Sequence, residues 1–410
     1  TCILVTFCLK LRYTITMISR YKKYFTPKQD KNLNNIFKPL YVLLTLLGLF
    51  PYSIKFQNRS FAIIHKSIYI NAVCGVSVLL TICAFLGLHI QYIRMSFEDD
   101  SMIDEIMTQV NYVFELVALA MFCLVVYISS FLYRSEFVSM LSKFSKWMDP
   151  SNIHGVKILK QLRFKINFAM GCLLLLLITQ ICVNFTRDDS IWKTALVLIT
   201  FNLPQMVQFT SIAFYYILVS MVVAIINNVT DHVKIVTKGK LVTNSFINGE
   251  SKSTLSLKQL ESIYVQVFEV KQEINQAFQG SILVTTMQCF HSMVSEAYII
   301  YHGTIQLSLS PHEILNCSVW IFYQVLKIFV LSSSGSLLKV ALGQALHKIP
   351  IEKNDLKLLI QHFSTLMTYY GNELNVYGFF PLDATLMFKV IASSTMYLII
   401  LVQFDKKSSV

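Results

Sequence analysis

Charge is what this sequence has least of. Lys, Arg, Asp and Glu make up 14% of the 410 residues, whereas they make up about 25% of an ordinary soluble domain. Hydrophobic residues make up 54%, and a composition this apolar excludes a water-soluble fold of one or two domains. The net charge of +12 does not indicate nucleic-acid binding, because the basic residues gather in alternate connections between apolar stretches, which is a membrane-topology pattern.

The motifs of the common enzyme classes are also missing. The sequence contains no P-loop, dinucleotide-binding, zinc-protease or nucleophile-elbow motif, so we expect no enzymatic activity and no cofactor. Its nine cysteines show no CxxC spacing, so we expect no metal site and interpret them as small hydrophobic residues. Cys182 and Cys317 lie near one predicted surface, and their pairing stays open. No internal repeat is visible, which disfavours a transporter.

What the sequence does contain is long apolar stretches. Each is long enough to cross a bilayer as a helix, and none alternates as a barrel strand would. We therefore predict an all-α, polytopic membrane protein with seven transmembrane helices. The predicted spans are Ser67–Ile93, Ile106–Tyr133, Ile166–Thr186, Thr194–Thr230, Ile274–Ile300, Ile314–Leu346 and Leu386–Phe404.

The distribution of Lys and Arg predicts the orientation. The segments before the first span and after the second, fourth and sixth are rich in these residues, and the intervening segments are not. Segment 94–105, for example, holds Arg94 against five acidic residues. The positive-inside rule therefore places the N-terminus in the cytosol and the C-terminus outside the cell.

Four regions follow from this topology. Residues 1–66 form a cytosolic segment with an amphipathic helix that ends near Pro51, and residues 67–346 hold six transmembrane helices with a ligand pocket. Residues 347–380 form a cytosolic amphipathic anchor helix, whose apolar face packs either within one chain or between subunits. Residues 381–410 form the seventh helix and a short outer tail, and copies of this helix around an axis would make it pore-lining.

Polar residues inside the predicted spans are the candidate binding groups. A charged side chain at this depth is costly and usually marks a function or a pairing partner, and Lys327 is expected to pair with Glu115 or Glu296. Aromatic walls with a few polar groups suit a small-molecule pocket, although each residue is alternatively an internal helix–helix hydrogen bond. The predicted pocket residues are Glu115, Gln205, Gln208, His291, Glu296, Trp320 and Tyr323.

The last span has its own polar pattern. Small and hydroxyl residues at 392–395 allow close helix–helix approach in lipid. Gln403 needs water or a partner, because an unpaired amide in hydrocarbon costs roughly 2–7 kcal/mol. Gln403 either lies in the headgroup layer, or lines a narrow polar hole if copies of this helix surround an axis. Lys389 either reaches the cytosolic surface by snorkelling or faces that hole.

Three stretches resemble a known family. Tyr397, five apolar residues and Gln403-Phe404 resemble the C-terminal TYhhhhhQF signature of insect gustatory receptors. GFFPLDATLMF at 378–388 resembles that family's approach to its last helix, and KPLYVLLTLLGLFPYSI at Lys38–Ile54 resembles a segment near its other end. Met396 departs from the signature, which has Thr there.

The resemblance implies a tastant-gated, non-selective cation channel in the plasma membrane of a sensory neuron. It implies a homo- or hetero-tetramer with other receptor subunits, in which the last helices surround the pore and a hydrophobic ring gates by dewetting. Sugar receptors of this family carry Glu where this chain has Leu398, so we expect a bitter or other non-sugar small organic ligand. An odorant receptor subunit and a metabotropic seven-helix receptor remain alternatives. The predicted pore and gate residues are Gln403, Phe404, Leu401, Ile400 and Tyr397.

Overall fold

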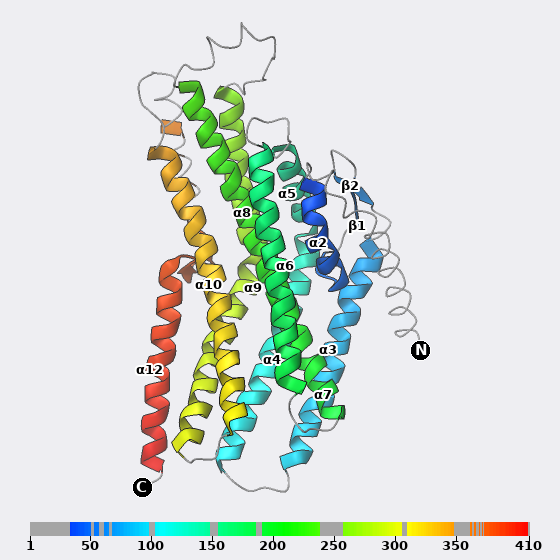
Figure 1. Cartoon of the computed structure of the whole chain (residues 1–410), viewed down its shortest axis with the longest axis vertical. Coiled ribbons are helices and arrows are strands. Elements are labelled where there is room, and N and C mark those ends of the chain that lie inside the picture. The colour runs from blue at the N-terminus through cyan, green and yellow to red at the C-terminus, as the bar shows by residue number, and fades with distance from the viewer. Residues whose placement is uncertain are drawn as a thin grey trace.

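The protein is a bundle of long helices that run along one axis (Figure 1). The computed structural model describes residues 33–50, 53–56, 61–64, 68–97, 103–147, 155–185, 191–237, 257–305, 310–347, 361–362, 365, 369, 371 and 373–408. The helices are α2 (Leu33–Leu46), α3 (Ile68–Phe97), α4 (Ile103–Leu132), α5 (Arg134–Trp147), α6 (Gly155–Phe185), α7 (Ile191–Val197), α8 (Leu203–Thr237), α9 (Leu257–Ile305), α10 (Pro311–His347) and α12 (Ala384–Ser408), with a π-helix, η4 (Leu198–Asn202), between α7 and α8.

In the described residues, two short antiparallel hairpins accompany this bundle. Strand β1 (Ser53–Phe56) pairs with β2 (Phe61–Ile64), and β3 (Asn375–Val376) pairs with β4 (Phe380–Pro381). The second hairpin leads directly into α12. The described residues are otherwise nearly all helical, which confirms the predicted all-α class.

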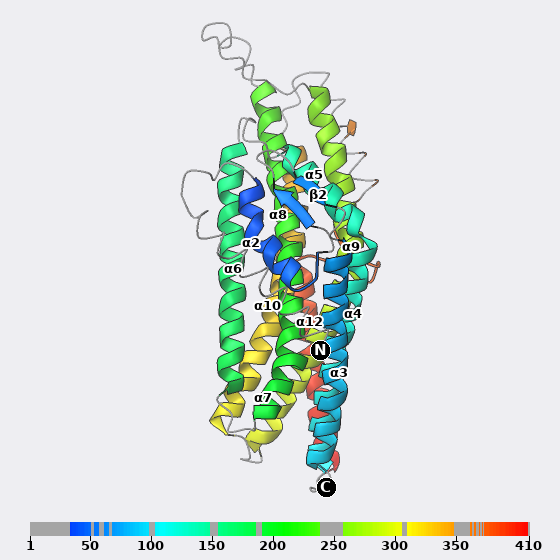
Figure 2. The same cartoon turned by 90° about the vertical axis from the view of Figure 1, so that its right-hand side faces the viewer.

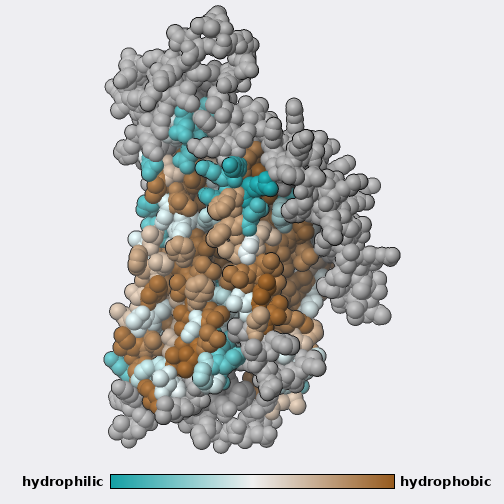
Figure 3. All heavy atoms as spheres, viewed as in Figure 1, coloured by the Kyte–Doolittle hydropathy of each residue, from teal (hydrophilic) through white to brown (hydrophobic). Residues whose placement is uncertain are grey.

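In the part of the chain that the structure describes, six helical spans are long and apolar enough to cross a membrane. They are Ala72–Met95, Val110–Leu132, Leu159–Cys182, Thr194–His232, Pro311–Gln344 and Ala384–Gln403. The predicted fifth span lies within α9, a helix of 49 residues that runs along the bundle beside α8 and α10 (Figure 1). Apolar residues gather over the middle and lower parts of the face in Figure 3, and hydrophilic residues gather toward its upper end. A multi-span membrane protein is therefore confirmed.

The ends of the helices alternate as the charge pattern requires. The C-terminal ends of α3, α6, α9 and α12 lie at the lower end in Figure 1, as do the N-terminal ends of α4 and α10. The segments that the positive-inside rule groups together therefore do leave the bundle at a common end. That the upper end faces the cytosol remains a prediction.

Helix α8 is the centre of the bundle. It contacts α4, α6, α9 and α10, and its side chains fill much of the main hydrophobic core. Helix α2 lies beside α6 in the upper half of the molecule in both views (Figures 1 and 2). Along this helix Phe37, Leu40 and Leu44 recur at helical spacing, and all three are fully buried.

Part of the prediction concerns residues that the structure does not describe. Most of the predicted anchor helix lies outside the described residues, including its apolar positions at 356, 359, 360, 363, 366, 367 and 370. The N-terminal 32 residues also lie outside them. The predicted packing of the anchor helix stays a prediction.

Candidate functional site

A buried polar network joins the three central helices. Lys327 Nζ on α10 donates to Gln208 Oε1 on α8 at 2.7 Å. Gln208 Nε2 donates to Gln288 Oε1 on α9 at 2.7 Å, and to Thr285 Oγ1 at 3.3 Å. All four side chains are at most 2% exposed. An amide that accepts from an ammonium and donates to another amide satisfies both groups away from water.

A carboxylate lies beside this network on α4. Ser292 Oγ donates to Glu115 Oε1 at 2.9 Å, and Glu115 interacts electrostatically with Lys327. The predicted pairing of Lys327 with Glu115 is present as an electrostatic interaction, while the hydrogen bond of the Lys327 ammonium goes to the Gln208 amide. The cause is the position of α8, which lies among α4, α9 and α10 and places its amide against the lysine.

Aromatic rings extend from this network toward the end of the bundle where α10 begins. The Phe209 ring lies 5.3 Å from Lys327 Nζ and 5.7 Å from the Tyr323 ring. Trp320 lies 5.9 Å from Tyr323 and 6.0 Å from Phe201. These centroid separations fall in the range of favourable aromatic pairs. Two predicted pocket residues, Trp320 and Tyr323, therefore belong to one continuous wall with the lysine at its other end.

The end of this wall at Phe201 contains a histidine that the sequence did not indicate as a site residue: the His89 ring lies 6.3 Å from the Phe201 ring. His89 Nδ1 lies 2.6 Å from Thr200 Oγ1, whose hydroxyl donates to the Leu196 carbonyl at 2.8 Å. Since that proton is used, the hydroxyl accepts from His89 Nδ1–H, which leaves Nε2 to accept from Tyr112 OH at 3.4 Å. Thr200 lies in the π-helix η4, a rare element that is frequently found at functional sites. A lone His inside the first apolar span was the available signal.

The structure does not gather the remaining predicted pocket residues along this aromatic wall. Gln205 is fully buried, and neither of its amide atoms has a hydrogen-bond partner in the described part of the chain. The His291 ring lies 4.1 Å from the Phe114 ring, on the seam between α9 and α4. Glu296 is buried further along α9. Glu115 and Gln208 are thus associated with the polar network, Trp320 and Tyr323 with the aromatic wall, and His291 with the α4–α9 seam.

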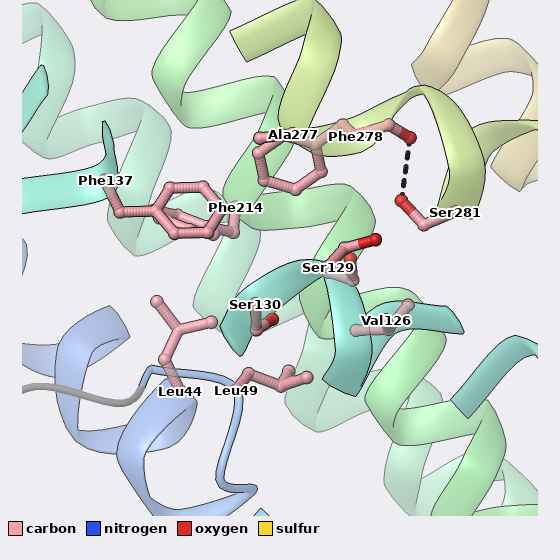
Figure 4. Close-up of a pocket in the computed structure, with 11 residues that line it drawn as sticks. Leu44, Leu49, Val126, Ser129, Ser130, Phe137, Phe214, Ala277, Phe278 and Ser281 are labelled. Carbon is pink, nitrogen blue, oxygen red and sulfur yellow. Dashed lines mark hydrogen bonds between the residues drawn. The ribbon is translucent and has the colours of Figure 1, made fainter. Parts of the chain in front are cut away.

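The cavity in Figure 4 lies elsewhere. The volume that the centre of a water molecule can occupy in this cavity is about 10 Å³, so the cavity holds about one water. No predicted pocket residue lines it, and it is too small for an organic ligand. Its lining comes from α2, α4, α5, α8, α9 and the turn after α2, and consists of Leu44, Leu49, Val126, Ser129, Ser130, Phe137, Ser211, Phe214, Ala277, Phe278 and Ser281.

Among the described residues, helix α12 packs against the rest of the chain along one side. It contacts α9 and α10 through Leu386, Val390 and Ser394, which recur every four residues and are at most 8% exposed. The Tyr397 ring lies 6.0 Å from the Phe290 ring of α9. One stripe of the helix is therefore packed within the chain, and most of its other described side chains are exposed.

The predicted pore residues divide between these two sides. At about 100° per residue, Gln403 lies about 180° around the helix from Ser394, and its side chain is exposed. Ile400 is 41% exposed, whereas Leu401 is half-buried. Gln403 therefore points away from the chain's own helices, as a pore-lining residue must. The side chain of Phe404 lies outside the described ones.

Within the described ranges, the cysteines and the metal-binding residue types add no further site. Cys182 and Cys317 are both free thiols, so the disulfide left open above does not form. Among the described residues, no group of His, Cys, Asp and Glu side chains is arranged to hold a metal ion.

Comparison with known proteins adds a family and a fold. The family model of the 7tm chemosensory receptors matches residues 37–408. The structure resembles that of the insect olfactory receptor OR5 from Machilis hrabei, with a TM-score of 0.67 and 12% identity, over 91% of this chain and 98% of that chain. The structure of OR5 in complex with eugenol gives a TM-score of 0.68 at the same identity and coverage. At this identity the likeness concerns the fold.

Curated relatives match over shorter segments. Gustatory and pheromone receptor 32a of Drosophila melanogaster is 26% identical over 124 residues, which are 28% of this chain and 26% of that receptor. Gustatory receptor 68a of Drosophila melanogaster is 24% identical over 167 residues, which are 38% of this chain and 43% of that receptor. The matched segments thus span less than half of either relative.

Proposed function

The chain belongs to the 7tm chemosensory receptor family, and from this membership we propose that it is a gustatory receptor acting as a ligand-gated cation channel. Four subunits assemble with α12 of each around a central pore. The ligand is a small organic tastant other than a sugar. The protein is a multi-pass membrane protein, and we propose the plasma membrane of a sensory neuron as its location.

The observation that carries this proposal is the exposure of α12. In the α12 span, 17% of the most apolar stretch is buried within the chain, although the residue types there are small and polar as well as apolar. Lipid alone does not favour an exposed Gln in a helix of this kind, because an unpaired amide in hydrocarbon is costly. Copies of α12 around water give Gln403 partners and give the small residues at 392–395 a close contact.

Binding of a small organic ligand is supported by the aromatic wall. Phe201, Trp320, Tyr323 and Phe209 form a continuous apolar surface beside buried polar groups, the combination that ligand sites use. The olfactory receptor OR5, which shares the fold, has been solved with eugenol, a small aromatic molecule. Leu398 follows Tyr397 here, and this residue supports a ligand other than a sugar.

A gustatory role is favoured over an olfactory one by the sequence. The curated relatives reported above are gustatory receptors, and the Gln403-Phe404 ending fits that family's signature. The olfactory receptor OR5 shares the fold at 12% identity, so an odorant receptor subunit is the second candidate. Expression in gustatory rather than olfactory neurons separates the two.

Whole-cell recording of cells that express this chain alone, across a panel of tastants, tests the channel. We expect a ligand-evoked cation current, and Gln403→Ala should change its conductance or ion selectivity, since this residue lines the proposed pore. Gln161→Ala is the matched control, because Gln161 is exposed on α6, far from α12 in sequence. A tastant-evoked current that is identical in the wild type and in Gln403→Ala contradicts the proposed pore.

The orientation separates the channel from a metabotropic receptor. The positive-inside rule predicts a cytosolic N-terminus, whereas seven-helix receptors coupled to G proteins have the opposite orientation. An N-terminal epitope tag should be reached by antibody only after the cells are permeabilised. Labelling of the tag on intact cells would contradict the proposed channel.

A further inference from the structure

The segment before α12 is fixed to α10 by backbone contact. Leu374 and Leu382 are at most 2% exposed, and the Leu382 amide donates to the Leu374 carbonyl at 2.7 Å. On α10, a Cβ atom at Gly335 would lie 2.6 Å from the Leu382 carbonyl carbon and would overlap its oxygen. Only a glycine permits this approach, so the hairpin β3–β4 sits directly on the backbone of α10.

A single lysine next to this contact holds both ends of the hairpin. Lys339 on α10 lies one turn after Gly335, and its Nζ is 2.6 Å from Glu373 Oε1. The same nitrogen is 3.5 Å from Asp383 Oδ2. Glu373 precedes β3 and Asp383 follows β4, so one ammonium group bridges the beginning and the end of the segment.

Asp383 is also the N-cap of α12. Its Oδ1 accepts from the Thr385 amide at 2.9 Å and from the Thr385 hydroxyl. A carboxylate at this position satisfies a free amide and interacts favourably with the helix dipole. The hydrogen bonds from Thr385, followed by the contact with Lys339, lower the pKa of Asp383. The residue that begins α12 is therefore bound to α10 through its other oxygen.

Helix α9 holds the same segment from the other side. Lys271 Nζ donates to the Gly371 carbonyl at 2.5 Å, and Asn275 Nδ2 donates to the Asn375 carbonyl at 2.9 Å. Lys271 also interacts electrostatically with Glu373. Glu373 thus lies between a lysine of α9 and a lysine of α10.

From these contacts we propose that Lys339 is a positioning residue for α12. Through Glu373 and Asp383 it holds the first turn of α12 to α10, so that α12 follows any displacement of α10. Helix α10 also carries Lys327, twelve residues earlier and therefore about 18 Å away along the helix, in the buried polar network. The effect of Lys339 on gating rests on the proposed function. The attachment of α12 to α10 through Lys339 does not depend on that function.

Hydrogen–deuterium exchange of the purified full-length protein tests the attachment. The probe is the set of backbone amides at 382–387, and the variant is Lys339→Met, which keeps the apolar stem and removes the charge. We expect these amides to exchange about threefold to tenfold faster, the range for a partly exposed pair within a small network. Lys160→Met is the control, since Lys160 is exposed on α6; it should leave the exchange unchanged.

A double-mutant cycle separates attachment from a general loss of stability. Glu373→Gln alone should also accelerate exchange, and adding it to Lys339→Met should add little, because the two residues act on one contact. Fully additive effects would overturn the proposal. So would unchanged exchange at 382–387 in Lys339→Met.

Ligand-free current in cells that express each variant tests the effect on gating. Lys339→Met should change the ligand-free current by about threefold or more, and Lys160→Met should not. Faster exchange with an unchanged ligand-free current would overturn the positioning role. If the wild-type chain carries no current under any condition, the proposed function fails, while the exchange experiment still decides whether Lys339 holds α12.

Discussion

Helices α8 and α12 are both apolar enough to cross a membrane, yet they have opposite surroundings. In the span that contains α8, 89% of the most apolar stretch is buried within the chain, whereas in the α12 span the share is 17%. Helix α8 contacts α4, α6, α9 and α10, and α12 contacts α9 and α10. Apolar composition alone therefore does not show which helix a bundle is built around and which lies at its edge.

The difference shows which polar groups find partners inside one chain. Gln208 on α8 is fully buried and bonds to α9 and α10, so its role is complete in a single subunit. Gln403 on α12 is exposed on the side opposite the packed stripe, so its partners are water, lipid headgroups or another chain. A change in α8 should thus act on folding, and a change on the free side of α12 on assembly and conduction.

The largest effect is expected where α8 is most buried. Gln208→Ala removes the acceptor of Lys327 and the donor to Gln288, and leaves an ammonium without its partner in a low-dielectric core. We expect a loss of about 2–4 kcal/mol in the free energy of unfolding, seen as a large fall in the thermal denaturation midpoint of the purified protein.

Thr210→Val is the control for this change on the same helix. Thr210 is also fully buried, but its hydroxyl has no hydrogen-bond partner in the described part of the chain. Replacing an unpartnered hydroxyl with a methyl group of the same shape should be nearly neutral. Equal losses for the two variants would contradict the polar network.

A smaller effect is expected where α12 is joined to the bundle. Gly335→Ala forces the β3–β4 hairpin away from α10, which should cost about 1–3 kcal/mol. Gly343→Ala, two turns further along α10, meets no atom within 4 Å and should stabilise the helix by up to about 1 kcal/mol. Thermal denaturation should therefore move in opposite directions for the two variants, and a shift in the same direction would contradict the close approach.

Alkaline pH should change the stability of the same junction through Lys271 on α9. Burial lowers the pKa of Lys271 from 10.5 to about 8, against the opposing effect of Glu373. Below pH 8, Lys271 is protonated in both the folded and the unfolded chain, so the burial of its charge lowers the free energy of unfolding by its full amount. Between about 8 and 10.5 the unfolded chain binds more protons, so the free energy of unfolding rises with pH by about 1 kcal/mol per pH unit at most.

Thermal denaturation between pH 7 and pH 10 checks this dependence. Lys271→Met should lack this pH-dependent gain in stability. The thermal denaturation midpoint of the wild type should therefore rise relative to that of the variant above pH 8. A difference that stays constant over this range would show that the pKa of Lys271 is not lowered.

The smallest effect on stability is expected on the free side of α12. Met396 is 67% exposed, so Met396→Ala should change the unfolding free energy of one chain by less than about 0.5 kcal/mol. It should instead weaken assembly, because this side is where copies of α12 would meet. Thermal denaturation measures the change in stability, and size-exclusion chromatography in detergent measures the change in assembly. A large loss of stability without any loss of assembly would contradict the roles assigned to α8 and α12.

Much of the fold followed from hydropathy, and the detail of the site did not. Uninterrupted apolar stretches such as Thr194–Thr230 predict helices regardless of their neighbours. The contacts between helices depend on how each helix is rotated about its axis and on the angle at which two helices cross. The hydrophobic periodicity of a single sequence does not specify either. Lys327 was therefore expected against a carboxylate, and the structure places it against an amide. His89 was missed because a neutral His scarcely interrupts an apolar stretch.

The most direct test of the central claim is disulfide cross-linking at Gln403 in a full-length protein whose native cysteines are replaced. Gln403→Cys, oxidised in the membrane of expressing cells, should give covalent dimers in high yield, since neighbouring copies lie close around a narrow pore. Ser394→Cys, on the packed stripe of α12, should give none. A Gln403→Cys protein that remains monomeric under the same oxidation would contradict a pore built from α12.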